Sequence, residues 1–200
     1  MSKLPNFLTL LRIFLLPLLI YLIIESNSSF NLAILMLFIV IALSDYFDGV
    51  IARKTNSTSE FGKMLDPIAD KLFVVLLIIT FIYNDYINEI NLIPAYLIIF
   101  REIFISGLRE YASNLPEVKK IDVSILGKYK TAFQILSLFL ILIGSIYIDL
   151  KPLLNIGIYL FWLSTIITLI SAYQYYKSCL LYTSDAADEG LGVDLGGRRI

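Results

Sequence analysis

Long runs of apolar residues, separated by short polar segments, occupy most of the chain. A helix of about 17–25 apolar residues is long enough to cross a hydrocarbon core about 30 Å thick. Six runs approach or reach this length: Leu8–Ile24, Phe30–Ile51, Pro67–Tyr83, Leu92–Leu108, Thr131–Ile148 and Leu153–Tyr176. The pattern therefore predicts an all-α integral membrane protein with six transmembrane helices.

The composition agrees with this pattern and excludes several classes of protein. The 200 residues are 58% hydrophobic and 16% charged, whereas soluble domains are about 45–50% apolar and about 25% charged. The net charge of -1 provides no overall positive field for nucleic acid. The single cysteine, Cys179, cannot form an internal disulfide. We therefore exclude a soluble enzyme, a disulfide scaffold and a nucleic-acid-binding module.

Basic residues are distributed unevenly between the polar segments. They occur in the N-terminal segment, in the second and fourth connections and after the last apolar run. The first and third connections contain no Lys or Arg, and the fifth contains only Lys151. Basic segments of membrane proteins face the cytoplasm. The sequence therefore predicts that both termini are cytoplasmic.

Four aspartates lie near the ends of apolar runs, where a bilayer tolerates them poorly: Asp45 and Asp48 in the second run, and Asp66 and Asp70 around the start of the third. An Asp near the centre of a membrane helix costs about 2.5–3.5 kcal/mol on insertion. Each pair shares a helical face, and a short hairpin would bring the pairs together. Carboxylate oxygens suit Mg²⁺, Mn²⁺ or Ca²⁺, and two such ions form the clamp used in phosphoryl transfer.

The residues between the aspartates suit a ligand that carries phosphate. Gly49 and Ala52 have almost no side chain, so a bulky ligand could approach the helix backbone there. Arg53 has a guanidinium that can meet phosphate oxygens, and Gly62 clears the same face of the third helix. Read together, the pattern D-x2-D-G-x2-A-R-x8-G-x3-D-x3-D resembles the signature of the CDP-alcohol phosphotransferase family at every fixed position.

This resemblance implies a six-helix membrane fold, usually a homodimer. It implies two divalent ions, Mg²⁺ or Mn²⁺, held by the four aspartates, and it implies that Asp70 is also the general base. It further implies a CDP-linked lipid bound by its diphosphate near Gly49, Ala52, Arg53 and Gly62. The resemblance also suggests that Asn6 and Thr9 line the nucleotide pocket, whereas helix capping and interfacial anchoring are the ordinary alternative.

Other segments resemble one bacterial branch of that family, over essentially residues 3–177. They are PNFLTLLRIFLLP, DPIADKL, REIFISGLREYA and LGKYKTAFQ. This resemblance implies transfer of the phosphatidyl group from CDP-diacylglycerol to glycerol 3-phosphate, with release of CMP. The enzyme would then lie in the bacterial inner membrane, in contact with membrane lipid, with its active site facing the cytoplasm.

Basic residues near the fourth and fifth runs, with one hydroxyl, form a candidate site for the acceptor's phosphate: Arg101, Arg109, Lys128, Lys130 and Thr131. Cations beside a two-metal site could bind a small phosphorylated acceptor. The alternative is simple anchoring at the cytoplasmic interface. Glu102 and Glu110 each follow an arginine and could orient this cluster, although adjacent helical residues point apart.

Two other functions remain open. The same chemistry could use phosphatidylglycerol, serine or an inositol phosphate as acceptor, although a cluster of cations argues against serine. In a different class of protein, a transporter, buried carboxylates could form a cation pathway. A transport function does not explain why Gly49, Ala52, Arg53 and Gly62 occur at these positions between the aspartates.

The apolar pattern stops after Lys177 and is followed by CLLYTSDAADEGLGVDLGGRRI. This polar, glycine-rich string resembles a read-through translation of a sequencing-library adapter. We therefore expect residues 1–178 to form the membrane domain and residues 179–200 to be foreign to it. The alternative is a disordered cytoplasmic tail.

Overall fold

The computed structural model describes the backbone of residues 3–25, 27–55, 60–113 and 125–192, and the side chains of residues 10–25, 27–44, 65, 68–111 and 130–177. Within these ranges all regular structure is helical, which confirms the predicted all-α class. Six α-helices are joined in part by short 3-10 turns: α1 Lys3–Glu25, η1 Ser28–Phe30, α2 Asn31–Thr55, α3 Glu60–Tyr83, η2 Glu89–Asn91, α4 Leu92–Ser113, α5 Ile125–Ile146, η3 Ile148–Leu150 and α6 Lys151–Gly192.

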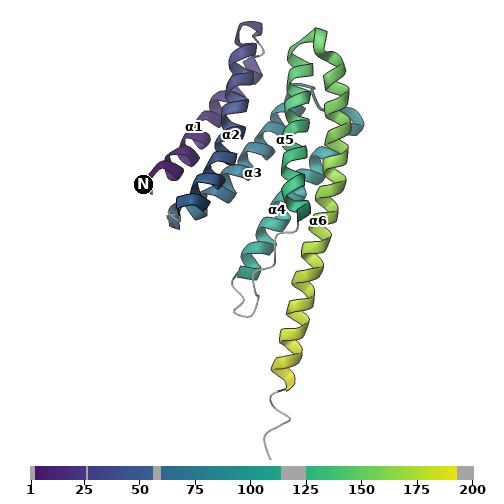
Figure 1. Cartoon of the computed structure of the whole chain (residues 1–200). Coiled ribbons are helices and arrows are strands. Elements are labelled where there is room, and N and C mark those ends of the chain that lie inside the picture. The colour runs from purple at the N-terminus through teal and green to yellow at the C-terminus, as the bar shows by residue number, and fades with distance from the viewer. Residues whose placement is uncertain (1–2, 26, 56–59, 114–124, 193–200) are drawn as a thin grey trace, which may run out of the picture.

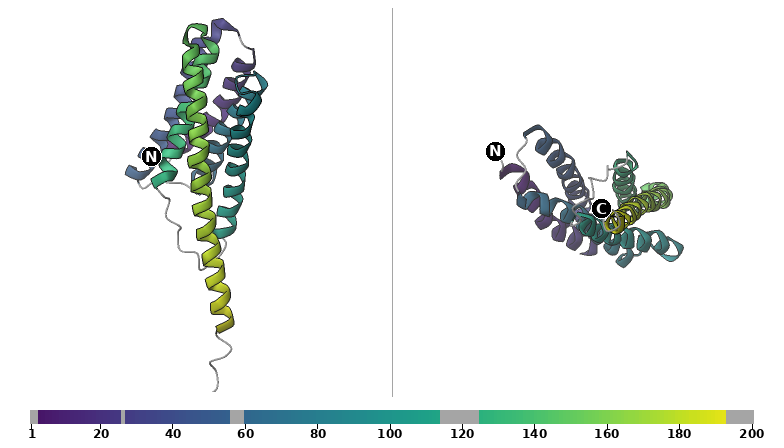
Figure 2. Two further views of the ribbon diagram at one scale, coloured as in Figure 1. Left: turned by 90° about the vertical axis from the view of Figure 1, so that its right-hand side faces the viewer. Right: turned by 90° about the horizontal axis from the view of Figure 1, so that it is seen from below.

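The helices run up and down as one bundle. Figure 1 shows the α1–α2 and α5–α6 connections at its upper end, whereas the start of α1 and the ends of α2, α4 and α6 lie lower. Helix α1 packs against both α2 and α3, α5 pairs with α6, and α4 packs on α6. The two groups meet where α5 contacts α2 and α3 and where α3 contacts α4. Figure 2 shows the bundle from the side and from below. Each predicted apolar run corresponds to one of the six helices.

Phe38 of α2 joins three helices in the buried core. Its ring centroid lies 5.4 Å from that of Phe73 in α3 and 5.3 Å from that of Phe139 in α5. Aromatic pairs in such tilted arrangements contribute about 0.5–1.5 kcal/mol beyond the area that they bury. This contact fixes α2, α3 and α5 relative to one another at the level just above the candidate site.

Two glycines allow α5 and α6 to approach closely. A Cβ atom on Gly144 would lie 2.8 Å from the Cα of Leu154, and one on Gly157 would lie 2.7 Å from the backbone nitrogen of Ile141. Small residues at such positions are the usual way in which membrane helices gain close backbone contact. The α5–α6 pair is therefore packed backbone to backbone.

Three buried hydroxyl groups on α5 and α6 are bonded within their own helices, whereas those of Ser145 and Thr168 have no hydrogen-bond partner among the described residues. Ser164 and Thr165 each donate to the carbonyl oxygen of Phe161 at 2.8 Å, and Ser137 donates to that of Gln134 at 2.8 Å. A buried hydroxyl without a partner is costly, so these bonds remove the cost locally.

Two described segments have the length and apolar composition of a membrane span, Glu89–Tyr111 and Ile148–Lys177. Ser28–Ser44 and Lys130–Ile146 are shorter apolar stretches. Many large apolar side chains are exposed on the outside of the bundle, among them Phe14, Leu32, Ile103 and Tyr159. A surface of this kind is typical of a face that contacts a membrane or another protein. The number of spans and the sidedness of the termini stay predictions.

Helix α6 continues to Gly192, well past the predicted end of the last apolar run at Tyr176. It therefore includes much of the segment that the sequence sets apart as foreign. Helical geometry does not reveal the origin of a sequence, so the boundary at residue 178 also stays a prediction.

Candidate active site

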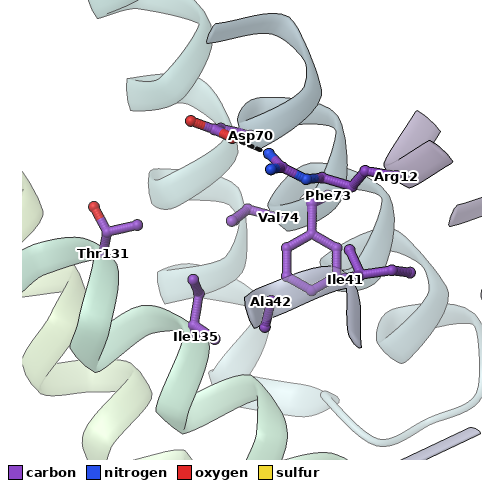
Figure 3. Close-up of a pocket in the computed structure, with 8 residues that line it drawn as sticks. All are labelled: Arg12, Ile41, Ala42, Asp70, Phe73, Val74, Thr131 and Ile135. Carbon is purple, nitrogen blue, oxygen red and sulfur yellow. Dashed lines mark hydrogen bonds and ion pairs between the residues drawn. The ribbon is translucent and has the colours of Figure 1, made fainter. Parts of the chain in front are cut away.

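A hollow of about 280 Å³, its open mouth included, lies between α1, α2, α3 and α5. Figure 3 shows the residues that line it: Arg12, Ile41, Ala42, Asp70, Phe73, Val74, Thr131 and Ile135. Apolar side chains from α2, α3 and α5 form much of the wall, whereas α1, α3 and α5 each contribute one polar side chain. The hollow can therefore receive a polar group against an apolar wall.

Asp70 and Arg12 form an ion pair at this hollow. Nη1 of Arg12 donates to Oδ1 of Asp70 at 2.7 Å, as the dashed line in Figure 3 shows. The Arg12 side chain is 3% exposed, whereas that of Asp70 is 46% exposed. Arg12 thus fixes one carboxylate oxygen from the buried side, and the carboxylate remains accessible from the open side.

From the sequence, Arg12 lies one turn beyond Asn6 and Thr9, in the segment that the resemblance places at the nucleotide pocket, but it has no role of its own there. Its signal was a positive charge within the first apolar run, and a charged residue inside a membrane segment is by default a candidate functional residue. The partner could not be read from the sequence, because 58 positions separate Arg12 from Asp70. Only the packing of α1 on α3 brings the two together.

The aspartates of the motif lie on two neighbouring helices. In α2, Asp45 and Asp48 come after Ile41 in the direction of the α2–α3 connection, and in α3 Asp66 comes before Asp70 in that same direction. Since Ile41 and Asp70 both line the hollow, the backbone places both pairs toward one end of it.

The other motif side chains lie outside the part of the chain whose side chains are described. They are Asp45, Asp48, Gly49, Ala52, Arg53, Gly62 and Asp66, and the same holds for Asn6, Thr9 and Lys128. Among the described residues no group of three or more His, Cys, Asp or Glu could hold a metal ion. The predicted metal site is therefore represented there by Asp70 alone.

A second charged cluster joins α4 to α5. Oε1 of Glu102 accepts a hydrogen bond from Nη1 of Arg101 at 3.3 Å and another from Nζ of Lys130. Arg101 and Lys130 are buried, and the side chain of Glu102 is 12% exposed. Two of the five predicted acceptor residues thus meet on one carboxylate oxygen.

Lys71 connects this cluster with Asp70. Its Nζ donates to Oγ of Ser106, which ties α3 to α4. The charge of Lys71 is attracted by those of Glu102 and Asp70 and repelled by those of two arginines, Arg109 and Arg101. Asp70 and the Arg101–Glu102 pair are therefore close enough for their charges to act on the same lysine.

The remaining predicted acceptor residues lie at different places. Thr131 lines the hollow. Arg109 is exposed, and its guanidinium carbon lies 5.8 Å from the centre of the Tyr175 ring in α6. Its charge nevertheless acts on both Arg101 and Lys130. Of the predicted acceptor residues, the described part of the site thus contains two buried cations paired with Glu102 and one exposed cation, in addition to the accessible carboxylate of Asp70. This arrangement can bind an anion and accept a proton.

Comparison with known proteins gives a consistent result. Residues 2–170 match the model of the CDP-alcohol phosphatidyltransferase family. The CDP-diacylglycerol–glycerol-3-phosphate 3-phosphatidyltransferase of Rickettsia typhi is 40% identical over 187 residues, which are 91% of this chain and 99% of the relative. The proteins of the same name from Wigglesworthia glossinidia brevipalpis and Haemophilus influenzae are 38% and 36% identical, over 87% and 88% of this chain and 93% and 92% of their own lengths.

Proposed function

The chain belongs to the CDP-alcohol phosphatidyltransferase family, and we propose that it transfers the phosphatidyl group of CDP-diacylglycerol to glycerol 3-phosphate, releasing CMP. Relatives named for this reaction match nearly the whole chain. The observation that carries the proposal within the structure is the position of Asp70, whose accessible carboxylate lines the hollow. The next residue, Lys71, is hydrogen-bonded to Ser106 of α4, the helix that contains Arg101. A phosphorylated acceptor needs both a base for its hydroxyl and cations for its phosphate.

We infer that the donor's diphosphate lies at the α2–α3 end of the hollow. The four aspartates would hold two divalent ions there, Mg²⁺ or Mn²⁺, and the accessible carboxylate of Asp70 is a hard oxygen donor of the kind that these ions prefer. When bound, the ions supply Lewis-acid stabilisation of the diphosphate charge. Around them, Gly49, Ala52, Arg53 and Gly62 would bind the diphosphate, and Asn6 and Thr9 the nucleotide.

The proposed chemistry is a displacement at the lipid-side phosphorus. The acceptor hydroxyl oxygen bonds to this phosphorus, its proton passes to the Asp70 carboxylate, and the bond from phosphorus to the CMP oxygen breaks. Arg12 holds one oxygen of Asp70 from the buried side and so orients the carboxylate in the hollow. The contribution of these side chains is orientation and proton transfer.

The acceptor's phosphate would bind to the cations of α4 and α5. Arg101 and Lys130 are buried, and Arg109 adds an exposed charge nearby. We assign Lys128 and Thr131 to the same site from their position at the start of α5. Glu102 offsets only one of these positive charges, so the remaining excess of positive charge favours an acceptor with a phosphate over a neutral alcohol.

We further propose that all six helices cross the bacterial inner membrane, with both termini and the active site on the cytoplasmic side, and that two chains form a homodimer. The alternating direction of the helices in Figure 1 and the exposed apolar side chains support a multi-span protein. The basic N-terminal segment and the basic second and fourth connections support the cytoplasmic sidedness. The homodimer rests on the family resemblance.

The decisive experiment is release of CMP by the purified protein from CDP-diacylglycerol with a panel of acceptors. The panel contains glycerol 3-phosphate, glycerol, serine, an inositol phosphate and phosphatidylglycerol. We expect turnover with glycerol 3-phosphate and very little with glycerol, because glycerol has no charge to offset the excess of positive charge in this cluster. Equal use of these two acceptors, or preference for serine, would refute the acceptor assignment.

A variant tests the acceptor site directly. Lys130→Gln removes one charge-assisted contact, so the acceptor's efficiency, kcat/KM, should fall about tenfold to hundredfold, whereas the KM of CDP-diacylglycerol should change little. Lys151→Gln, at an exposed lysine that begins α6 at the other end of the bundle, is the matched control. If Lys130→Gln impairs donor binding alone, Lys130 does not belong to the acceptor site.

A further inference from the structure

One carboxylate oxygen is shared by two buried cations from different helices. Oε1 of Glu102 accepts from Arg101, its neighbour in α4, and from Lys130 of α5. Neither α4 nor α5 alone contains all three groups. Glu102 is therefore the residue that holds the two cations on one oxygen atom.

The two cations would not stay together without this carboxylate. Like charges in a poorly solvated site repel strongly, and a buried cation that loses its partner is costly. Nε of Arg101 is also buried, with no hydrogen-bond partner among the described residues. The guanidinium thus uses Nη1 for Glu102 and retains further donor capacity.

We propose that Glu102 is a positioning residue for the acceptor: by holding Arg101 and Lys130 on one oxygen, it presets their remaining N–H groups to grip the acceptor's phosphate. This inference rests on the proposed function. Glu102 itself repels phosphate, so its contribution is the geometry of the two cations. Arg109 and Lys71, whose charges also act on this cluster, restore an excess of positive charge for a phosphate dianion.

The same helix contains a matched control. Arg109 and Glu110 repeat the adjacent pair Arg101–Glu102 about two helical turns later in α4. Glu110 is exposed, however, and Arg109 lies over the ring of Tyr175. The sequence pattern is identical at the two places. The two pairs differ in burial, and among the described residues Lys130 contacts Glu102 of the first pair.

The test compares steady-state kinetics of the wild type, Glu102→Gln and Glu110→Gln, with each substrate varied in turn. Glu102→Gln keeps the size of the side chain but removes its charge, so the KM for glycerol 3-phosphate should rise about tenfold, the loss of one charge-assisted contact. Its kcat and its KM for CDP-diacylglycerol should stay within about twofold of the wild type, as should all constants of Glu110→Gln. A merely structural role would impair both substrates together.

Two further variants sharpen the result. Glu102→Asp restores the charge on a shorter side chain, and its KM for glycerol 3-phosphate should lie between those of the wild type and Glu102→Gln. In the double variant Glu102→Gln/Lys130→Gln, the two losses should be less than additive, because Glu102 acts through Lys130.

Three results would overturn the role of Glu102 while leaving the proposed function intact: an unchanged acceptor KM in Glu102→Gln, an equal rise for both substrates, or full additivity in the double variant. If Glu102→Gln fails to fold, Glu102→Asp decides instead, and an unchanged acceptor KM there overturns the inference. A wild-type protein that does not use glycerol 3-phosphate refutes the proposed function itself, and the inference with it.

Discussion

Replacing Arg12 by glutamine should slow the reaction by releasing Asp70. Arg12 donates to Asp70 at 2.7 Å and is 3% exposed, so it is held firmly within the bundle. Asp70 is the proposed base, and a base contributes only when its oxygen is within hydrogen-bond reach of the proton that it removes. Glutamine preserves much of the bulk of Arg12 but lacks its charged, planar guanidinium group.

The expected size of the effect follows from the contact. A hydrogen bond to a charged group contributes about 1.5–3 kcal/mol, and each 1.4 kcal/mol is a factor of about ten, so kcat should fall about tenfold to hundredfold. Because Asp70 is 46% exposed, water can replace part of the lost contact, and we expect the lower end of this range. The acceptor KM should change less than kcat, since Arg12 does not contact the charged cluster of α4 and α5 in the described structure.

The assay is CMP release at saturating concentrations of both substrates, with Arg12→Lys and Lys151→Gln measured alongside. Arg12→Lys keeps the positive charge but loses the planar guanidinium, so it should retain intermediate activity. Lys151→Gln, distant from the hollow, should behave as the wild type. The thermal unfolding of each variant in detergent shows whether it is folded. A folded Arg12→Gln protein with the kcat of the wild type would refute the positioning of Asp70 by Arg12.

Three further predictions concern other parts of the chain. Asp70→Asn should abolish turnover in a folded protein, and a chelator should stop the wild type reversibly; full turnover in either case would contradict the mechanism. Truncation after Ser178 should preserve expression and activity, because the segment beyond it lacks the apolar pattern of a membrane span; a large loss of activity would show that it is native. Gly144→Ala should destabilise the protein by about 1–3 kcal/mol by pushing α5 from Leu154, seen as a lower unfolding temperature, whereas Gly107→Ala, whose Cβ would meet nothing within 4 Å, should not.

The helices could be predicted well from the sequence, because the length of an apolar run and its polar boundaries are local properties. The last run shows the limit of that reasoning: apolar counting ends it at Tyr176, whereas α6 continues to Gly192. A helix can extend into water beyond a span, and hydropathy alone does not report this extension.

The candidate site was likewise predictable only in part from the sequence. The spacing of residues identified Asp70 as a candidate, because pairs three or four positions apart share a helical face. The ion pair with Arg12 depends on how α1 packs against α3, and no local pattern encodes it. Adjacent residues point apart on a helix, yet Glu102 contacts Arg101, because both side chains are long enough to reach one another. Long side chains can thus overcome the angular separation of their Cα atoms.

The hydrogen bonds of the buried hydroxyls have a consequence for how the protein is made. Ser137, Ser164 and Thr165 are satisfied within their own helices, so these three hydroxyls cost little when each helix enters the bilayer. Lys130 of α5 differs, because the carboxylate that it contacts, Glu102, belongs to α4. Since α4 precedes α5 in the chain, Glu102 is already present when Lys130 is inserted, and their pairing lowers the cost of burying that lysine.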